Sequence, residues 1–216
     1  MVSWRVRAEV GDDPDELVGV LAGRLSVDET GAVTGCDRLS LLPDGTEVTV
    51  RPGVPEDVPG VRAMHERCSA LTRYRRYLRA NPRLPERAAR RLLRGGAGCA
   101  LVAVGPGDRV VGLGNLEATP QPGVGEIALI VEDGWQRRGL GGALTRRLVL
   151  LGERRGVTAL TATTFASNQP MLRLFSREGL AEHRRFDGEL VHIRVPIETA
   201  ISWLGPGRAP GSGRSR

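Results

Sequence analysis

A cluster of glycines between an apolar run and an amphipathic stretch constrains this chain more than any other feature. The octad at 136–143 reads Gln-Arg-Arg-Gly-Leu-Gly-Gly-Ala and follows the apolar run at 127–131. Glycines let a ligand approach the backbone closely, and the first N–H groups of a helix lack a carbonyl partner within that helix. These N–H groups and the helix dipole attract anions. The segment therefore predicts a strand, a tight turn and a helix that together cradle a pyrophosphate.

Two other glycine-rich phosphate motifs do not fit the octad. A Walker loop needs Gly-Lys followed by Ser or Thr, and the chain contains no lysine. The dinucleotide fingerprint needs Gly-x-Gly-x-x-Gly and an acidic residue about 20 positions later, where this chain has residues 160–164, Leu-Thr-Ala-Thr-Thr. For the octad taken alone, a turn whose glycines only permit helix packing remains the alternative.

Composition indicates one main domain without a nucleic-acid or membrane partner. The net charge of +6 comes from arginine, but the arginines are scattered among acids without interleaved aromatic residues. No apolar run reaches the roughly 18 residues of a membrane span, and residues 1–10 carry charges where a signal peptide needs an apolar core. Cys36, Cys68 and Cys99 show no metal-ligand spacing. We expect a cytoplasmic protein, monomeric or homodimeric, with buried thiols and no metal.

Hydrophobic periodicity predicts alternating strands and helices in three parts. The parts are a small N-terminal appendage at 1–45 with a strand at 4–10 and a helix from 13 to 25, a main domain at 46–199, and a disordered tail at 200–216. Residues 43–45, Pro-Asp-Gly, are a turn signal that marks the first boundary. Within the main domain we expect helices at 55–68, 69–78, 85–93, 140–151 and 169–178, and strands at 47–51, 99–104, 110–117, 125–131 and 158–165, with a hairpin around 186–189 that ends near 195.

Two motifs in this order resemble the GNAT superfamily of N-acyltransferases. The spacing Gln136-x-x-Gly139-x-Gly141, after a strand and before a helix, resembles its acyl-CoA signature, and residues 168–180 resemble its Asn-to-Gly-Phe segment. The element order from 46 to about 196 is similar to the whole GNAT fold. The resemblance implies an α+β, or mixed α/β, fold with a central mixed, mostly antiparallel sheet flanked by helices. It also implies acetyl-CoA as the cosubstrate.

The same resemblance implies which residues hold the cofactor. The backbone at Val131 would bind the pantetheine arm like an added strand, and Asn168 would contact its amide end. Arginine side chains in the turn are natural phosphate partners, although such side chains often point into water. The expected pyrophosphate cradle consists of Gln136, Arg137, Arg138, Gly139, Leu140, Gly141, Gly142 and Ala143.

Residues 44–52, 65–67 and 72–77 resemble a narrower group, the bacterial protein lysine acetyltransferases often called Pat. Those enzymes modify acyl-CoA synthetases, so the resemblance implies a protein substrate with an exposed lysine and an acceptor side formed by the first helices. Alternatives are a small-molecule amine N-acetyltransferase and a catalytically silent acyl-CoA-binding regulatory module. The appendage faintly resembles the start of an ACT domain, and a plain strand and helix added to the sheet is the alternative.

Attack on a thioester requires a neutral amine, so a general base is useful. A lysine amine with a pKa of about 10.4 is neutral in only about one molecule in a thousand near pH 7. Glu126 lies on the strand just before the turn, where its carboxylate would face the reaction centre, and the Pat resemblance points to the same residue. A carboxylate facing solvent is the alternative, and His65, His183 and His192 are weaker competitors.

The usual general acid of the family is absent. In many members a tyrosine on the short helix after the fifth strand protonates the departing CoA thiolate, and the corresponding residue here is Phe175. A thiol with a pKa of about 8.5 is a tolerable leaving group, so solvent could protonate the thiolate. Phe175 would either pack on the pantetheine arm or fill the core.

Overall fold

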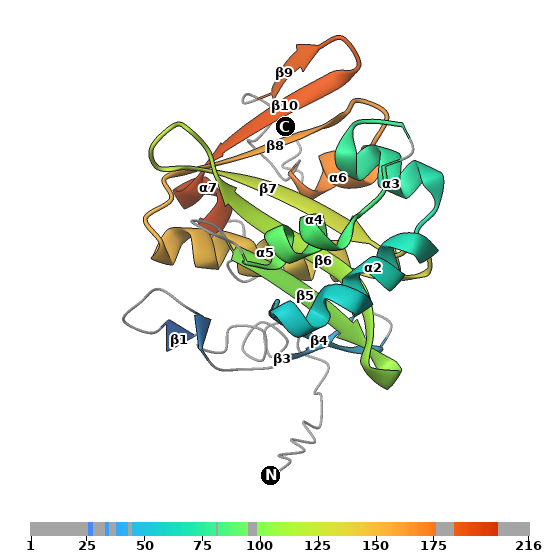
Figure 1. Cartoon of the computed structure of the whole chain (residues 1–216). Coiled ribbons are helices and arrows are strands. Elements are labelled where there is room, and N and C mark those ends of the chain that lie inside the picture. The colour runs from blue at the N-terminus through green and yellow to red at the C-terminus, as the bar shows by residue number, and fades with distance from the viewer. Residues whose placement is uncertain are drawn as a thin grey trace, which may run out of the picture.

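The computed structural model describes residues 26–27, 33–34, 38–42, 45–80, 82–94, 99–175 and 184–202. Its centre is an eight-stranded sheet with the strand order β3-β4-β5-β6-β7-β8-β10-β9 (Figure 1). Every neighbouring pair in this sheet is antiparallel except β7 and β8, which run parallel. The strands are β3 (Arg38–Leu41), β4 (Glu47–Pro52), β5 (Cys99–Gly105), β6 (Arg109–Ala118), β7 (Val124–Val131), β8 (Ala159–Phe165), β9 (Arg184–Asp187) and β10 (Leu190–Pro196). The expected mixed, mostly antiparallel sheet is confirmed.

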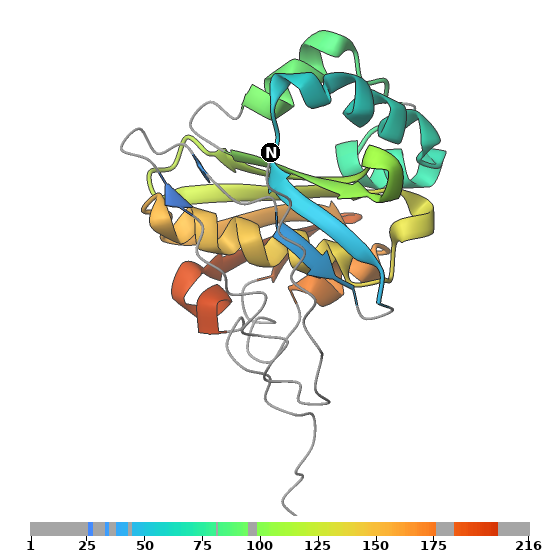
Figure 2. The ribbon, with the colours of Figure 1, turned by 90° about the horizontal axis from the view of Figure 1, so that it is seen from below.

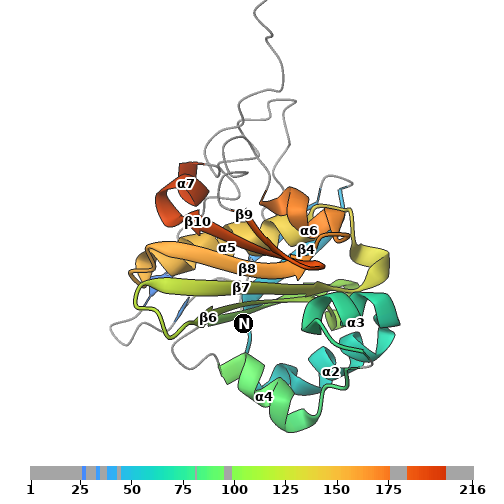
Figure 3. The ribbon, with the colours of Figure 1, turned by 90° about the horizontal axis from the view of Figure 1, so that it is seen from above.

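Helices cover both faces of the sheet. Figure 2 and Figure 3 show α2, α3 and α4 on one face and α5, α6 and α7 on the other. Short 3-10 helices lie in three of the connections, and a separate antiparallel pair of short strands, β1 (Ser26–Val27) and β2 (Val33–Thr34), precedes the sheet. The α-helices are α2 (Val58–Arg67), α3 (Ala70–Tyr77), α4 (Glu86–Arg94), α5 (Leu140–Arg154), α6 (Gln169–Leu174) and α7 (Ile197–Ser202), and the 3-10 helices are Pro55–Asp57, Pro106–Asp108 and Asp133–Trp135.

Two hydrophobic clusters hold these layers together. On one face, α2 and α4 bury Val61, Met64 and Leu93 against β5 and β6. On the other face, α5 lies along β5, β6 and β7, and its expected leucine stripe is buried to 1% exposure or less at every position: Leu140, Leu144, Leu148 and Leu151. Apolar residues three or four apart lie on one face of a helix, so this stripe fixes the rotation of α5 and the direction in which its first turn points.

The parallel strands β7 and β8 part soon after they meet. They pair at three positions: Val124 with Ala159, Gly125 with Leu160, and Glu126 with Thr161. Beyond Glu126 the rest of β7 keeps its partners in β6, while the rest of β8 pairs with β10. The edge of β7 that faces β8 is therefore unpaired from residue 127 onward, and the two strands leave a space between them.

The predicted order of elements in the main domain is confirmed, with two differences at its ends. β3 pairs along its whole length with β4, so the residues just before the turn at Gly45 form the edge of the main sheet. Residues 200–202, which we assigned to a tail, belong to α7, where Ile197 and Ala200 are buried. The strand at 4–10, the helix at 13–25, residues 176–180 and the rest of the tail lie outside the described residues. No described helix has the length and apolarity needed to span a membrane.

Candidate active site

A cavity of about 670 Å³ occupies the space between β7 and β8. Its walls come from α3, from β7 between Glu126 and Val131, from the glycine turn, from the end of β8 and from α6. Figure 1 shows α3 and α6 at the same end of β7 and β8. We call it the β7–β8 cavity. Most of the residues that we expected to bind acetyl-CoA from the sequence therefore meet in one space.

The glycine turn places the start of α5 at one end of this cavity. Gly139 caps the helix with φ of 92°, a left-handed conformation that favours glycine. The first bond of the α5 ladder runs from the Ala143 N–H to the Gly139 carbonyl, so the amides of Leu140, Gly141 and Gly142 precede the ladder and have no carbonyl one turn before them. This end of the cavity therefore presents free N–H groups and the positive end of a helix dipole.

Members of the expected cradle contribute in different ways. Gly139, Gly141, Gly142, Gln136 and Arg137 line the cavity. Leu140 is fully buried and anchors the helix, so only its backbone can serve an anion. Ala143 and Arg138 are not among the lining residues.

Two polar side chains of the turn make contacts within the protein. The Gln136 amide donates to the Val131 carbonyl at 2.9 Å and to the Thr72 hydroxyl at 3.0 Å. The Arg138 guanidinium lies over the Trp135 ring, 4.6 Å from its centroid, and donates to Thr46. Arg137 is thus the arginine of the turn that faces the cavity.

Val131 and Asn168 both face the same cavity. The N–H of Glu132 donates to Val111 in β6 at 3.0 Å, and successive N–H groups of a strand point to opposite edges. The Val131 N–H therefore points to the open edge of β7, where an extended amide can add as a strand would. Asn168, at the start of α6, donates from its side chain to the Thr164 hydroxyl at 2.9 Å, which leaves its carbonyl oxygen directed elsewhere.

Glu126 lies at the last paired position of β7 and β8, where the cavity begins. Its side chain is exposed. Its direct cross-strand partner on β6 is Glu117, and the Arg76 guanidinium of α3 approaches both carboxylates closely enough to interact electrostatically with them. Arg76 is itself held by a hydrogen bond of 3.2 Å to the Asn115 side chain. A carboxylate at this point is accessible to an amine that enters between the strands.

Hydrogen bonds tie α3 to the end of β7. The Asp133 carboxylate accepts from the Ser69 N–H at 2.8 Å, from the Ser69 hydroxyl at 2.7 Å and from the Thr72 hydroxyl at 2.9 Å. Burial alone would raise the pKa of Asp133, but these hydrogen bonds outweigh it and hold the pKa below its usual value. Thr72 also accepts from Gln136. The first turn of α3, the turn before α5 and the last residue of β7 thus form one connected unit.

Phe175 fills the core. It is 2% exposed, belongs to the cluster around α5 and does not line the cavity. The tyrosine on the cavity wall is Tyr77 of α3, and burial raises the pKa of its hydroxyl. The sequence pointed to Tyr77 only as part of the acceptor-side segment 72–77, not as a proton donor. Helical spacing could have flagged it, because Thr72, Arg76 and Tyr77 share the side of α3 that faces the cavity.

Of the other candidates from the sequence, His65 and His192 lie outside the cavity. His65 is 3% exposed and contacts the Tyr77 ring edge-on, with centroids 5.5 Å apart. His192 on β10 contacts the Thr163 hydroxyl at 3.2 Å. Tyr74 stacks on Phe165 at the end of β8, with centroids 4.6 Å apart. His183 lies outside the described residues.

The fold and the cavity define an acyltransferase that takes its acyl group from a CoA thioester. The N–H groups at the start of α5 match the pyrophosphate of CoA, and the open edge of β7 matches its pantetheine arm. The Glu126 carboxylate lies where β7 and β8 separate. The family model described as "Acetyltransferase (GNAT) family" matches residues 64–180, more than half of the chain, and the protein belongs to this family. It is an N-acetyltransferase with acetyl-CoA as its cosubstrate.

Solved structures share this fold at low sequence identity. The GNAT domain of S. lividans PAT superposes with a TM-score of 0.66 at 22% identity, over 73% of this chain and 95% of that one. The yncA protein of Salmonella typhimurium, solved with its cofactor acetyl-CoA, gives 0.56 at 17% identity, over 77% and 99%. The cAMP-binding acyltransferase of Mycobacterium smegmatis gives 0.50 at 22% identity, over 77% of this chain and 51% of that one.

Proposed function

We propose that this enzyme transfers the acetyl group of acetyl-CoA directly to the side-chain amine of a protein lysine, with Glu126 as the general base. One observation carries the proposal: Glu126, the anion cradle and the inward side of α3 line the same cavity. Cofactor and acceptor can therefore be bound together, without a covalent intermediate on the enzyme. The resemblance to Pat enzymes suggests an acyl-CoA synthetase as the acceptor protein.

Each part of the cavity has a role in this reaction. The amides at the start of α5 and Arg137 hold the pyrophosphate, and the Val131 N–H binds the pantetheine arm along the open edge of β7. An arm extended along β7 leads from the cradle toward Glu126. The thioester then lies where β7 and β8 part, beside the Glu126 carboxylate.

The chemical step needs one proton acceptor and one proton donor. The amine nitrogen forms a bond to the thioester carbon, Glu126 accepts the proton that the amine loses, and the C–S bond breaks to release the CoA thiolate. Phe175 cannot donate a proton to that thiolate. The Tyr77 hydroxyl, or solvent, supplies it instead.

Exposed apolar side chains beside the cavity support a protein acceptor. Leu71 is 53% exposed and Tyr74 is 36% exposed, and both lie on α3, the helix that supplies one cavity wall. Large exposed hydrophobic side chains around a site are common where a protein docks. A lysine side chain, long and flexible, can reach Glu126 from such a docked surface.

Mass spectrometry of an acyl-CoA synthetase incubated with the enzyme and acetyl-CoA tests both parts of the proposal. We expect new acetyl-lysine with the wild type, strongly reduced acetylation with Glu126→Gln, and normal acetylation with Glu117→Gln. Glu117 is the matched control, because it is the cross-strand partner of Glu126 on β6 but does not line the cavity. Absence of new acetyl-lysine would refute this acceptor, and full activity of Glu126→Gln would refute the base.

A small-molecule amine is the second candidate acceptor. Arg75 and Arg76 line the cavity, and a guanidinium there suits an amine that also carries a carboxylate. Thiol release with free amino acids, but not with proteins, would favour this alternative. A panel of amines and proteins assayed for CoA release under the same conditions distinguishes the two.

A further inference from the structure

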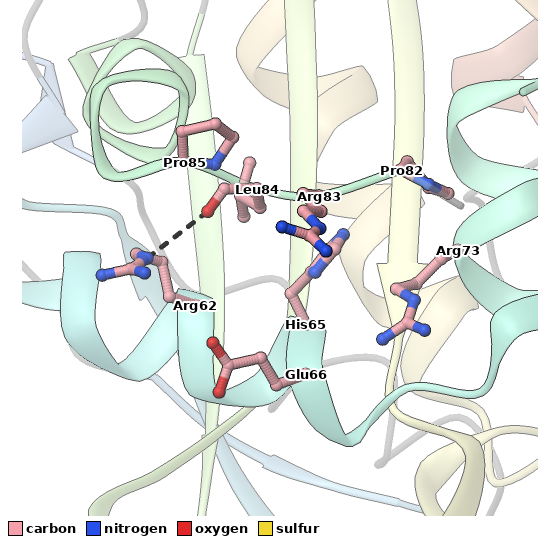
Figure 4. Close-up of a pocket in the computed structure, with 8 residues that line it drawn as sticks. All are labelled: Arg62, His65, Glu66, Arg73, Pro82, Arg83, Leu84 and Pro85. Atoms are coloured by element: carbon pink, nitrogen blue, oxygen red, sulfur yellow. Dashed lines mark hydrogen bonds between the residues drawn. The ribbon is translucent and has the colours of Figure 1, made fainter. Parts of the chain in front are cut away.

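A second cavity, of about 630 Å³, lies between α2, α3 and the segment at 82–85 (Figure 4). We call it the α2–α3 cavity. The two helices and the segment contribute Arg62, His65, Glu66, Arg73 and Arg83 to its lining. Leu84 and the two prolines at the ends of the segment supply an apolar wall. None of these residues lines the β7–β8 cavity, so the site is separate from the acetyl-CoA site.

Positive charge predominates around the α2–α3 cavity. Three guanidinium groups, those of Arg62, Arg73 and Arg83, face a single carboxylate, that of Glu66. Among the described residues, no carboxylate comes within 4.0 Å of any of the three guanidinium groups. Glu66, and Glu86 near Arg62 outside the cavity, offset only part of this positive charge, and an anion between the cations relieves their repulsion.

The positions of two of these arginines are defined by the fold. The Arg62 Nε donates to the Leu84 carbonyl at 3.3 Å, a contact drawn in Figure 4 that fixes the guanidinium beside the 82–85 segment. Arg73 extends from α3, and its Nε is buried without a hydrogen-bond partner. A guanidinium has five N–H donors in a rigid fork, so both arginines keep donors for a carboxylate or phosphate.

His65 adds a buried polar atom that lacks a partner. Its side chain is 3% exposed, and its Nε2 has no hydrogen bond. Burial, followed by the charge of Arg73, lowers the pKa of His65, so its ring is neutral at pH 7. A buried polar atom without a partner is unfavourable. In Figure 4 the ring points toward the 82–85 segment, into the group of arginines.

We propose that the α2–α3 cavity binds a small organic anion, whose carboxylate or phosphate lies between Arg62, Arg73 and Arg83. The apolar part of the anion packs on Leu84 and the prolines. A free phosphate or acetate ion fills little of 630 Å³, and ligand sites of this size are lined by apolar groups with a few placed polar ones. The observations therefore favour an anion with an apolar body over a bare ion.

The position of the site suggests how it affects the enzyme. His65 lines the α2–α3 cavity and contacts the Tyr77 ring, and Tyr77 lines the β7–β8 cavity. Arg73 and Tyr77 also lie on the same helix, α3. A ligand in the α2–α3 cavity could therefore affect the β7–β8 cavity through the contact between the His65 and Tyr77 rings, without entering the β7–β8 cavity.

Calorimetry with the whole chain tests the proposal, with saturating CoA present so that the pyrophosphate cradle is filled. The probes are phenyl phosphate, phenylacetate, inorganic phosphate and acetate. We expect one phenyl anion to bind once per chain, at least tenfold more tightly than the bare ion with the same charged group. Tighter binding of phenyl phosphate identifies a phosphate ligand, and tighter binding of phenylacetate a carboxylate. No saturable binding of any probe would overturn the proposal.

Variants locate the binding. Arg73→Gln should weaken binding of the phenyl anion at least tenfold, and Arg83→Gln, at an exposed position where the change does not threaten folding, should also weaken it. Arg91→Gln is the matched control, because Arg91 is exposed on α4 and does not line the cavity. Equal binding by all three variants would place the anion elsewhere and refute the site. None of these readouts depends on acetyl transfer.

Discussion

The side-chain amide of Gln136 donates a hydrogen bond to the carbonyl oxygen of Val131, at 2.9 Å. Both residues belong to the expected acetyl-CoA site, and here they contact each other. The bond ties the first residue of the glycine turn to the end of β7, and the same amide also reaches Thr72 of α3. Gln136 therefore holds the glycine turn, the end of β7 and α3 in place relative to one another, and its side-chain amide is engaged within the protein.

Replacement of Gln136 by alanine should loosen this unit. Two hydrogen bonds are lost, so we expect the free energy of unfolding to fall by about 1–2 kcal/mol. The KM for acetyl-CoA should rise more than kcat falls, because the change acts on cofactor binding. Urea unfolding and steady-state kinetics measure the two effects. Gln121→Ala, which removes only an exposed hydrogen bond from Arg194, should leave the kinetics unchanged and alter stability little; a fall in kcat alone would contradict the positioning role.

The carboxylate of Glu126 should matter for the chemical step and little for cofactor binding. Loss of a general base costs about 100- to 10,000-fold in rate, so Glu126→Gln should lower kcat by that order. Calorimetry should give the same affinity for acetyl-CoA as the wild type, because the carboxylate lies at the opposite end of β7 from the cradle. An equal loss of kcat in Glu117→Gln would contradict a base role for Glu126. The loss would then come from removing negative charge at this pair of strands.

Tyr77 should assist departure of the thiolate. Burial raises the pKa of its hydroxyl, so the hydroxyl stays protonated at neutral pH and can donate. A thiol is a tolerable leaving group, and we therefore expect kcat of Tyr77→Phe to fall by at most about 100-fold, the lower end for acid catalysis. Tyr74→Phe provides the matched control, since that ring stacks on Phe165 instead of lining the cavity. Unchanged kcat in Tyr77→Phe would leave solvent as the donor.

Phe175→Tyr tests whether the usual tyrosine of the family can be restored. The side chain at this position is 2% exposed within the α5 cluster. A hydroxyl added there has to be buried, and an unpaired buried hydroxyl costs about 1–3 kcal/mol. We expect a lower melting temperature without a gain in kcat. A higher kcat would show that the hydroxyl reaches the thiolate and that the position belongs to the site.

Local patterns in the sequence predicted the fold, and they also pointed to residues that the structure brings together around the β7–β8 cavity. The leucine stripe of α5 and the apolar run of β7 are periodic over many residues, and the glycine turn lies between them, so the cradle and Glu126 follow from short-range information. The sequence did not predict α7, because the helix is short: among its described side chains, Ile197 and Ala200 are buried and Ile201 is partly buried. A short segment offers too few repeats for a period to be recognised.

Features that depend on distant partners could not be predicted from local patterns. The Gln136 side chain turns toward Thr72, which lies 64 positions earlier, and Arg138 reaches Thr46, 92 positions earlier. The short strand β3 likewise becomes part of the sheet only through its pairing with β4, which the pattern of β3 alone does not indicate. The direction of a polar side chain is decided by such contacts, so the sequence identified the residues of the turn but not which of them face the cavity.

Glu132 should make the stability of this enzyme sensitive to acid. Its carboxylate accepts hydrogen bonds from Arg67, at 2.9 and 3.0 Å, and from Arg109. Burial alone would raise the pKa of Glu132, but the two arginines outweigh it and lower the pKa below the ordinary value of 4.5. A carboxylate whose pKa is lower in the folded state stabilises the fold above its unfolded pKa, and this stabilisation is lost as the pH falls through the folded pKa.

Glu132→Gln should remove that contribution. We expect the variant to be less stable than the wild type at pH 7 by about 1.5–3 kcal/mol, the range for hydrogen bonds to charged groups. The difference should shrink as the pH falls below about 4.5, because the wild-type carboxylate then becomes protonated. Urea unfolding at pH 7 and at several values below 4.5 measures the difference, with the exposed Glu153→Gln as control. A difference that stays constant with pH would mean that Glu132 acts through packing instead of charge.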